Sequence, residues 1–257
     1  MNRSVDKREP GSLDMGDIVA GAWTAYLRTP ERWLAITAIS FVVVVALQMA
    51  FGDRLNIDGD PTAEQVEESL PYVGVSLGVS AIAELFTHTA LIAGAFTVLG
   101  GAALSVGGAY AKGARRFLPA LAGSLLVGLI AALLSATLIL LPLAVYLFVN
   151  WSLLVQVVVN EGEGPLRAMG RSRQIVRGQW WRTLGINLAI ALLAFLPGLV
   201  ISRVTGPIDQ QWVTALGAGI GTSLTAPFIA LAQTLLYADL RARKGERPQS
   251  QPVGEPQ

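Results

Sequence analysis

The stretch FLPALAGSLLVGLIAALLSATLILLPLAVYLFVNWSLLVQVVV, residues 117–159, decides the fold because its 43 residues include no charged side chain. As a single helix it would be about 64 Å long, at 1.5 Å per residue, which is about twice the thickness of the hydrocarbon core of a bilayer. The stretch is therefore predicted to cross a membrane twice. Pro142 lies near its middle and disfavours a continuous helix, so the turn between the two crossings is predicted there.

The composition of the whole chain agrees with a membrane protein. Hydrophobic residues make up 53% of the 257 residues and charged residues only 14%, whereas a soluble domain carries about a quarter charged residues. The chain has no cysteine, which excludes disulfides, cysteine-based zinc sites and iron–sulfur clusters. Its net charge of +1 gives no reason to expect nucleic acid as a partner.

Four further apolar runs surround this stretch, at residues 33–51, 71–99, 181–201 and 212–237. Together with the two crossings of residues 117–159, these four runs predict an all-α fold, a polytopic bundle of about six transmembrane helices. Ser12 and Asp14 favour the start of an amphipathic helix at the membrane interface, and residues 52–70 are acidic and are predicted to form a solvated, partly helical loop. The predicted division is a disordered N-terminus at 1–11, a transmembrane domain at 12–244 and a disordered tail at 245–257.

The distribution of basic residues predicts the orientation. If residues 117–159 count as two crossings, 17 of the 19 lysines and arginines fall on one side, and only Arg54 and Arg203 fall on the other. Cytoplasmic loops carry the excess of basic residues, so both termini are predicted to be cytoplasmic, in a bacterial cytoplasmic membrane. The segments 13–22 (LDMGDIVAGA), 104–113 (LSVGGAYAKG) and 165–178 each precede a crossing, which suggests three hairpins, each introduced by an interfacial helix.

Two segments carry a family resemblance: VNEGEGPLRAMGRSRQIVRGQWWRTLG at 159–185 and APFIALAQTLLYADLRARK at 226–244. They resemble the bacterial membrane-domain family named after glycerophosphoryl diester phosphodiesterases, to which that domain is sometimes fused. The matching positions are Glu161, Gly162, Arg171, Ser172, Trp181, Arg182, Leu236, Tyr237, Asp239, Leu240, Arg241 and Arg243. The resemblance implies a helical membrane domain of undefined biochemical role. It does not imply hydrolysis, because the chain has one histidine and no room for a soluble metal-binding barrel.

Glu84 and His88 are the sharpest candidates for a site inside the membrane. They are four residues apart, so they share one face of the predicted helix 71–99, and an ionisable residue inside a membrane is a functional candidate by default. One interpretation is a proton relay or a contact for a polar substrate, with Asn150 as a further polar member. The other is a structural hydrogen bond from a neutral Glu84 to His88 or Thr87. Further polar residues on the predicted crossings, which favour interhelical hydrogen bonds or a polar pathway, are Gln156, Asn187 and Gln233.

A second candidate is the basic segment after the fourth crossing, with Arg167, Arg171, Arg173 and Arg177. One interpretation is contact with the anionic lipids of the cytoplasmic leaflet. The other is a topology signal that only keeps the loop inside. The family-motif residues at the end of the chain are expected to form a surface ion cluster, and they are Asp239, Arg241 and Arg243.

The sequence contains no phosphate-binding loop, no H-E-x-x-H pair and no G-x-S-x-G elbow. We therefore expect a non-enzymatic protein without cofactor or metal, an accessory or scaffold that organises lipid or a membrane partner. Its expected partners are membrane lipids, with another membrane protein or a second copy of the chain as further candidates. The alternative is a small transporter or channel that uses Glu84 and His88.

Overall fold

The computed structural model describes residues 13–55, 62–205 and 211–246, and the described residues form helices, turns and short connections without any strand. The predicted all-α class is confirmed. The helices are α1 (Met15–Arg28), α2 (Pro30–Leu55), α3 (Ala63–Leu99), α4 (Val106–Ser135), the 3₁₀ turn η1 (Leu138–Leu140), α5 (Leu141–Trp151), α6 (Leu154–Glu161), α7 (Pro165–Val176), α8 (Trp180–Thr205) and α9 (Gln211–Ala242).

Six segments of the described chain are long and apolar enough to cross a membrane. They are Pro30–Phe51, Ala63–Leu99, Val106–Ser135, Leu141–Glu161, Trp180–Ile201 and Gly219–Ala242. Outside the core, large apolar side chains are open to the surroundings, as on α4, where Leu118 is 71% exposed and Leu133 is 66% exposed. Such a surface is unfavourable in water and is the surface that lipid covers.

Local capping signals explain where two of the helices begin. Asp14 caps α1, in a capping box that Asp17 completes, so the predicted start of this helix is confirmed at Asp14; Ser12 lies outside the described residues. In α3 the equivalent pair is Thr62 and Gln65. The helix therefore starts eight residues before Pro71, and the prediction that the second crossing begins at Pro71 was wrong.

The predicted break within residues 117–159 is present. Helix α4 ends at Ser135, and α5 begins at Leu141 with Pro142 in its first turn, where proline costs no hydrogen bond. The turn thus lies just before Pro142. A second interruption, at residues 152–153, separates α5 from α6 and was not predicted.

The predicted plan of three hairpins, each with its own introductory helix, holds for two of the three. Helices α1 and α7 are separate elements that precede α2 and α8. The segment 104–113 instead leads directly into α4, which runs without interruption from Val106 to Ser135. Pro227 lies within α9, which continues past it.

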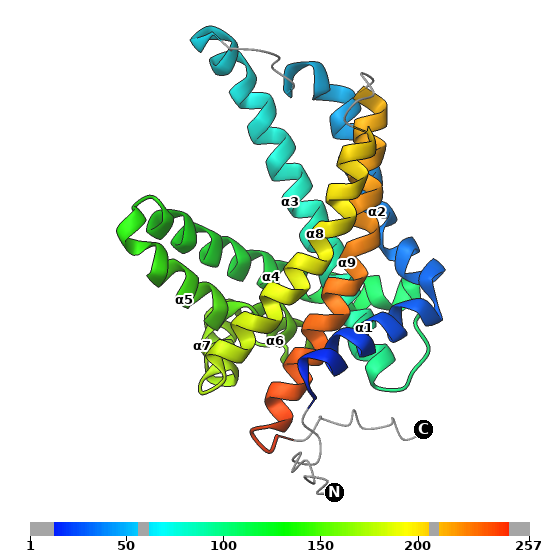
Figure 1. Cartoon of the computed structure of the whole chain (residues 1–257), viewed down its shortest axis with the longest axis vertical. Helices are drawn as coiled ribbons and strands as arrows, with labels where there is room; N and C mark the ends of the chain where they lie inside the picture. Colours follow the sequence, from blue (N-terminus) through cyan, green and yellow to red (C-terminus); the bar gives the residue numbers. More distant parts are fainter. Residues whose placement is uncertain (1–12, 56–61, 206–210, 247–257) are drawn as a thin grey trace, which may run out of the picture.

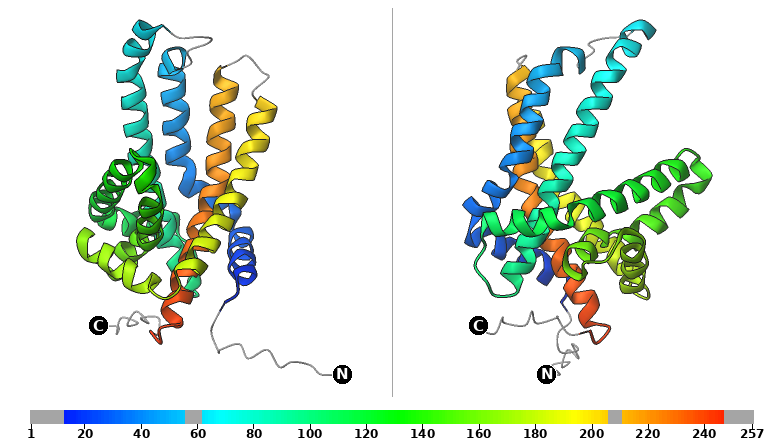
Figure 2. Two further views of the ribbon diagram at one scale, coloured as in Figure 1. Left: turned by 60° about the vertical axis from the view of Figure 1, so that its left-hand side comes forward. Right: turned by 180° about the vertical axis from the view of Figure 1, so that it is seen from behind.

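The helices leave one packed centre in two directions (Figures 1 and 2). Helices α2, α3, α8 and α9 run side by side toward one end, where α2 ends and α3 begins. The hairpin of α4 and α5 leaves the centre sideways. The short helices α1, α6 and α7 surround the final part of α9 at the opposite end.

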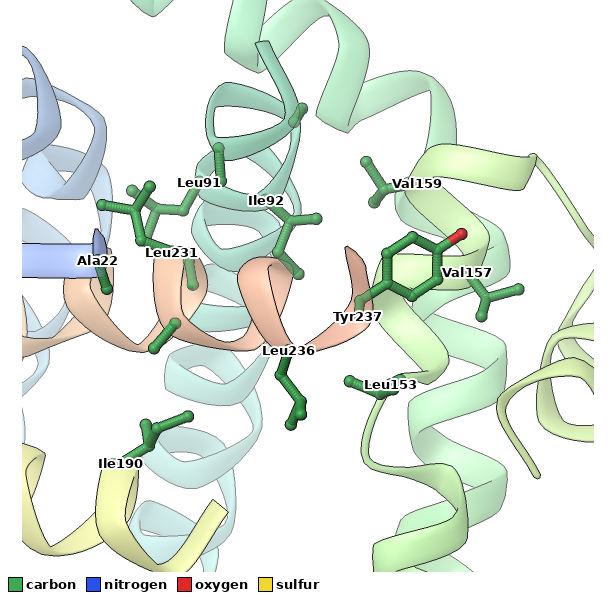
Figure 3. Close-up of a cluster of buried hydrophobic side chains, with 14 of the residues drawn as sticks. Ala22, Leu91, Ile92, Leu153, Val157, Val159, Ile190, Leu231, Leu236 and Tyr237 are labelled. Atoms are coloured by element: carbon green, nitrogen blue, oxygen red, sulfur yellow. The ribbon is translucent and has the colours of Figure 1, made fainter. Parts of the chain in front are cut away.

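The buried core gathers at that packed centre, where the second half of α3, α6 and the second half of α9 meet (Figure 3). Leu91 of α3 lies beside Leu231 of α9, and Tyr237 lies beside α6. Glycine permits the closest approach: a Cβ on Gly113 of α4 would lie 2.7 Å from the backbone nitrogen of Ala90 in α3.

Candidate functional site

The structure brings the two motif segments together. The end of α6, α7 and the start of α8 come from the first segment, and the last turns of α9 come from the second. They meet in two groups of charged side chains. We call them the Glu161 cluster (Asn160, Glu161, Arg171, Tyr237, Arg241, Glu246) and the Asp239 cluster (Asp239, Arg182, Arg243 and the backbone of Leu13).

Glu161 connects α6 to both α7 and α9. Its Oε2 accepts a hydrogen bond from Nε of Arg171 at 2.9 Å, and its Oε1 accepts one from the hydroxyl of Tyr237 at 2.6 Å. Nη1 of Arg241 lies 3.8 Å from the same Oε1 and donates to the Tyr237 hydroxyl at 3.0 Å. The Tyr237 hydroxyl therefore donates to a carboxylate while it accepts from a guanidinium.

Glu246 extends this cluster beyond the end of α9. Its Oε2 accepts from Nε of Arg241 at 2.9 Å and forms a second ion pair with Arg171. The sequence assigned Glu246 to the tail that starts at residue 245, but its carboxylate belongs to the packed domain. Residues 247–257 of the predicted tail, like residues 1–11, lie outside the described residues.

Asp239 is fully buried at its side chain and ties both ends of the chain to α8. One carboxylate oxygen accepts from the backbone N–H of Leu13 at 2.8 Å. The other accepts from Arg182 and from Arg243, each at 2.9 Å. Both arginines also donate to the Leu13 carbonyl. The segment before α1, the start of α8 and the end of α9 are thus joined at one carboxylate.

The paired charges of both clusters favour a fixed joint between the helices that carry them. The hydrogen bond from Arg171 lowers the pKa of Glu246, and the same contact raises the pKa of Arg171. Each of the three carboxylates, Glu161, Asp239 and Glu246, faces two guanidinium groups. Carboxylates that are paired with two guanidinium groups in this way hold helices together.

The four arginines predicted to contact lipid are divided between two roles. Arg171 turns toward the Glu161 cluster, with its side chain 25% exposed, whereas Arg167, Arg173 and Arg177 are exposed. Of the three motif residues near the end of the chain, Asp239 and Arg241 are buried and only Arg243 is partly exposed. The expected ion cluster is present, but it lies inside the joint and not on the surface.

The candidate site inside the membrane is not assembled in the same way. Glu84 is exposed on α3 and His88 is half-buried, and neither forms a hydrogen bond or ion pair within the described part of the chain. The side chain of Asn150 is buried and donates to the carbonyl of Tyr146 in its own helix at 2.7 Å. No hydrogen bond connects Asn150 with Glu84 or His88 in residues 13–55, 62–205 and 211–246.

Two other polar residues of the crossings pair between helices, as one interpretation of the sequence expected. The amide of Gln156 in α6 donates to Gln233 in α9 at 3.0 Å. Asn187 in α8 donates to the hydroxyl of Ser152 at 3.3 Å. Both contacts join helices within the packed centre.

Sequence reasoning missed Glu246, Asn160 and the backbone of Leu13 as members of the two clusters. Glu246 follows α9 in a segment that is otherwise rich in proline and glutamine, and a backbone group leaves no sequence signal. Among the described residues, no group of three or more histidine, aspartate or glutamate side chains could hold a metal ion. Comparison of the chain with protein-family models, with curated proteins and with solved structures finds no match.

Proposed function

We propose that this chain is a non-enzymatic accessory or scaffold protein of the bacterial cytoplasmic membrane that organises anionic lipid on the cytoplasmic side. Membership of the membrane-domain family that the two motif segments resemble is part of this proposal. The observation that carries it is the outer face of α7. There, three arginines are exposed while the fourth fixes the helix to the body of the protein.

The exposed residues of α7 form one continuous face. At about 100° per residue, Leu166, Arg167, Arg173 and Arg177 fall within an arc of about 120° of the helix circumference. Leu166 is 72% exposed, and Trp181, at the start of α8, is 79% exposed. Basic residues with large apolar and aromatic neighbours suit the boundary between lipid headgroups and hydrocarbon.

Arg171 supports this arrangement from the edge of the face, about 40° around the helix from Arg167. Its ion pairs with Glu161 and Glu246 fix the rotation of α7, so that the outer face stays outward. A basic residue near an anionic leaflet contributes about 1 kcal/mol. Three such residues on a rigid helix would give a measurable preference for anionic lipid.

The placement of the other charges supports the proposed orientation, with both termini cytoplasmic. Arg32 donates to the carbonyl of Leu104, and Arg116 donates to the carbonyl of Gly162. These contacts fix Arg32 of α2 and Arg116 of α4 to the segments before α4 and after α6, at the end of the molecule that holds the two clusters. The opposite end carries Arg203 and the acidic start of α3.

The test compares full-length protein with a variant that carries Arg167→Gln, Arg173→Gln and Arg177→Gln. Both are reconstituted in nanodiscs with equal amounts of phosphatidylglycerol and phosphatidylcholine and then moved into mild detergent, and the retained lipids are identified by native mass spectrometry. We expect the wild type to retain mainly phosphatidylglycerol and the triple variant to lose this preference. Arg203→Gln, at the opposite end of the molecule, is the control and should behave as wild type. Equal lipid profiles for wild type and triple variant would overturn the proposal.

The alternative, a small transporter or channel that uses Glu84 and His88, has less support. It would need Glu84, His88 and Asn150 to line one hydrated path, whereas Asn150 is buried and bonded within its own helix. A proton-coupled flux through reconstituted protein that Glu84→Gln abolishes would reverse this order.

A further inference from the structure

An apolar groove with a cavity volume of about 730 Å³ lies between α1, α8 and α9. Val19, Trp23 and Tyr26 line it from α1, and Phe228 lines it from α9. The ring of Trp23 packs edge-on against both Tyr26 and Phe228, with centroids 5.9 and 6.1 Å apart. The groove is separate from the α7 face and from the two charged clusters.

The groove is continuous with the surface that faces hydrocarbon. Leu196 and Val200 of α8 and Leu224 of α9 line it and are also exposed, at 53%, 62% and 39%. They lie on helices long and apolar enough to cross a membrane. The volume is within the range of about 300–1,000 Å³ that is typical of sites for small ligands.

Two polar groups of the lining lack their ordinary partners. Tyr26 is only 5% exposed, and its hydroxyl donates no hydrogen bond to any residue that the structure describes. Pro197 lies inside α8 and has no N–H to donate to the carbonyl of Leu193, one helical turn earlier. The hydroxyl is not one of the fully enclosed polar atoms without a partner, so it is open to the groove that Tyr26 lines. An unpaired hydroxyl that faces hydrocarbon is costly, so a ligand with an acceptor oxygen is the favoured occupant at Tyr26.

The charges near Tyr26 indicate its depth. Arg28, Glu31 and Arg32 follow within six residues, and all three are exposed. Charged side chains are expensive in hydrocarbon and are found near its boundary. Tyr26 and Trp23 therefore lie close to the interface, where tyrosine and tryptophan are enriched and where the ester groups of phospholipids are found.

We propose that the groove binds one membrane phospholipid, with an acyl chain between α1, α8 and α9 and an ester carbonyl that accepts a hydrogen bond from Tyr26. A carbon-lined groove that opens toward hydrocarbon fits an acyl chain. The unpaired hydroxyl of Tyr26, at the level of the interface, fits the ester oxygen. A second copy of the chain could cover the exposed rim, but it would leave the hydroxyl of Tyr26 without an acceptor.

The test fills the groove with a larger side chain and measures how much lipid the purified protein retains. Ala194 of α8 lines the groove, whereas Ala191, one turn earlier, is exposed outside it. We expect native mass spectrometry of detergent-purified protein to show one more retained phospholipid per chain for wild type and for the control Ala191→Phe than for Ala194→Phe. Tyr26→Phe keeps the shape of the groove and removes one hydrogen bond, so we expect about fivefold weaker retention.

Three results would overturn the proposal: no retained lipid in wild type, equal retention by Ala194→Phe, or equal retention by Tyr26→Phe. A wild-type dimer that Ala194→Phe converts to a monomer would assign the groove to a second copy instead. The α7 triple variant should keep this lipid, because the groove is independent of that face. The lipid that the α7 triple variant retains therefore distinguishes a failure of this inference from a failure of the proposed function.

Discussion

Glu246 is held by two guanidinium groups, and the hydrogen bond from Arg171 lowers its pKa below the ordinary value of 4.5. A carboxylate with a lowered pKa in the folded protein contributes stability above its unfolded pKa. That contribution disappears as the pH falls through the folded value. The joint between α6, α7 and α9 should therefore resist moderate acid and weaken only below about pH 4.5.

We expect Glu246→Gln to lower the free energy of unfolding at pH 6 by about 1 kcal/mol, since the ion pairs are partly exposed. The difference from wild type should shrink below pH 4.5, as the wild type loses the same charge. Thermal unfolding in mild detergent between pH 6 and pH 3 measures this. Glu163→Gln is the control, because Glu163 forms no ion pair with the described residues. A difference that stays constant over this range would contradict the prediction.

The sequence identifies the charged residues of the joint but not how they pair. Arg167 and Arg171 are one helical turn apart and look equivalent in the sequence, yet only Arg171 turns inward. The difference arises because Glu161 and Glu246 approach α7 from α6 and from the end of α9. Such long-range placement leaves no trace in the local pattern. Glu84 and His88 show the reverse case, in which a conspicuous local pair acquires no partner among the described residues.

At the scale of elements, α3 and α4 approach closely at Gly113. Its Cβ position lies 2.7 Å from the backbone nitrogen and 2.8 Å from the Cα of Ala90. Backbone atoms cannot move aside as a flexible side chain does. The pairing of these two helices therefore depends on the absence of a side chain at residue 113.

We expect Gly113→Ala to destabilise the protein by about 1–3 kcal/mol, because α3 and α4 must separate. Gly128, also within α4, has no atom within 4 Å of its Cβ position. Gly128→Ala should be neutral or stabilising by up to about 1 kcal/mol, because alanine favours helix. Thermal unfolding followed by circular dichroism compares the two variants. Equal stability of the two would show that the helices do not pack this closely.

The local sequence predicts that a helix exists more reliably than it predicts where that helix begins and ends. The apolar runs predict the six crossing segments, because each run has the length that a bilayer demands. The start of α3 was predicted too late, because the acidic composition of residues 63–70 suggested a loop. The helix begins there nevertheless, since Thr62 and Gln65 cap it and it continues through Pro71. The break at 152–153 has no glycine or proline to announce it, and after it α6 packs mainly against α4, α7 and α3.

At the scale of the whole molecule, the packed centre and the two groups of helices that leave it set the geometry. Hydropathy gives the number of apolar segments, whereas their directions depend on which faces pack together. Interhelical contacts such as Gln156 with Gln233 decide this. The sequence therefore predicts the hairpin of α4 and α5 but not that it leaves the centre sideways from α2, α3, α8 and α9 (Figure 2).

The direction of this hairpin makes its tip the most informative place to test the crossing count. The chain has no cysteine, so a single introduced cysteine gives labelling without background. Thr137, between α4 and η1, and Gly170, on α7, are both exposed. If α4 and α5 each cross, a membrane-impermeant maleimide added to intact cells should label Thr137→Cys and spare Gly170→Cys, and inverted vesicles should give the reverse. Labelling of both only in inverted vesicles would place the hairpin on the cytoplasmic side, because the tip would then share the side of α7. The count would fall to four crossings, and the hairpin would be a re-entrant or interfacial element.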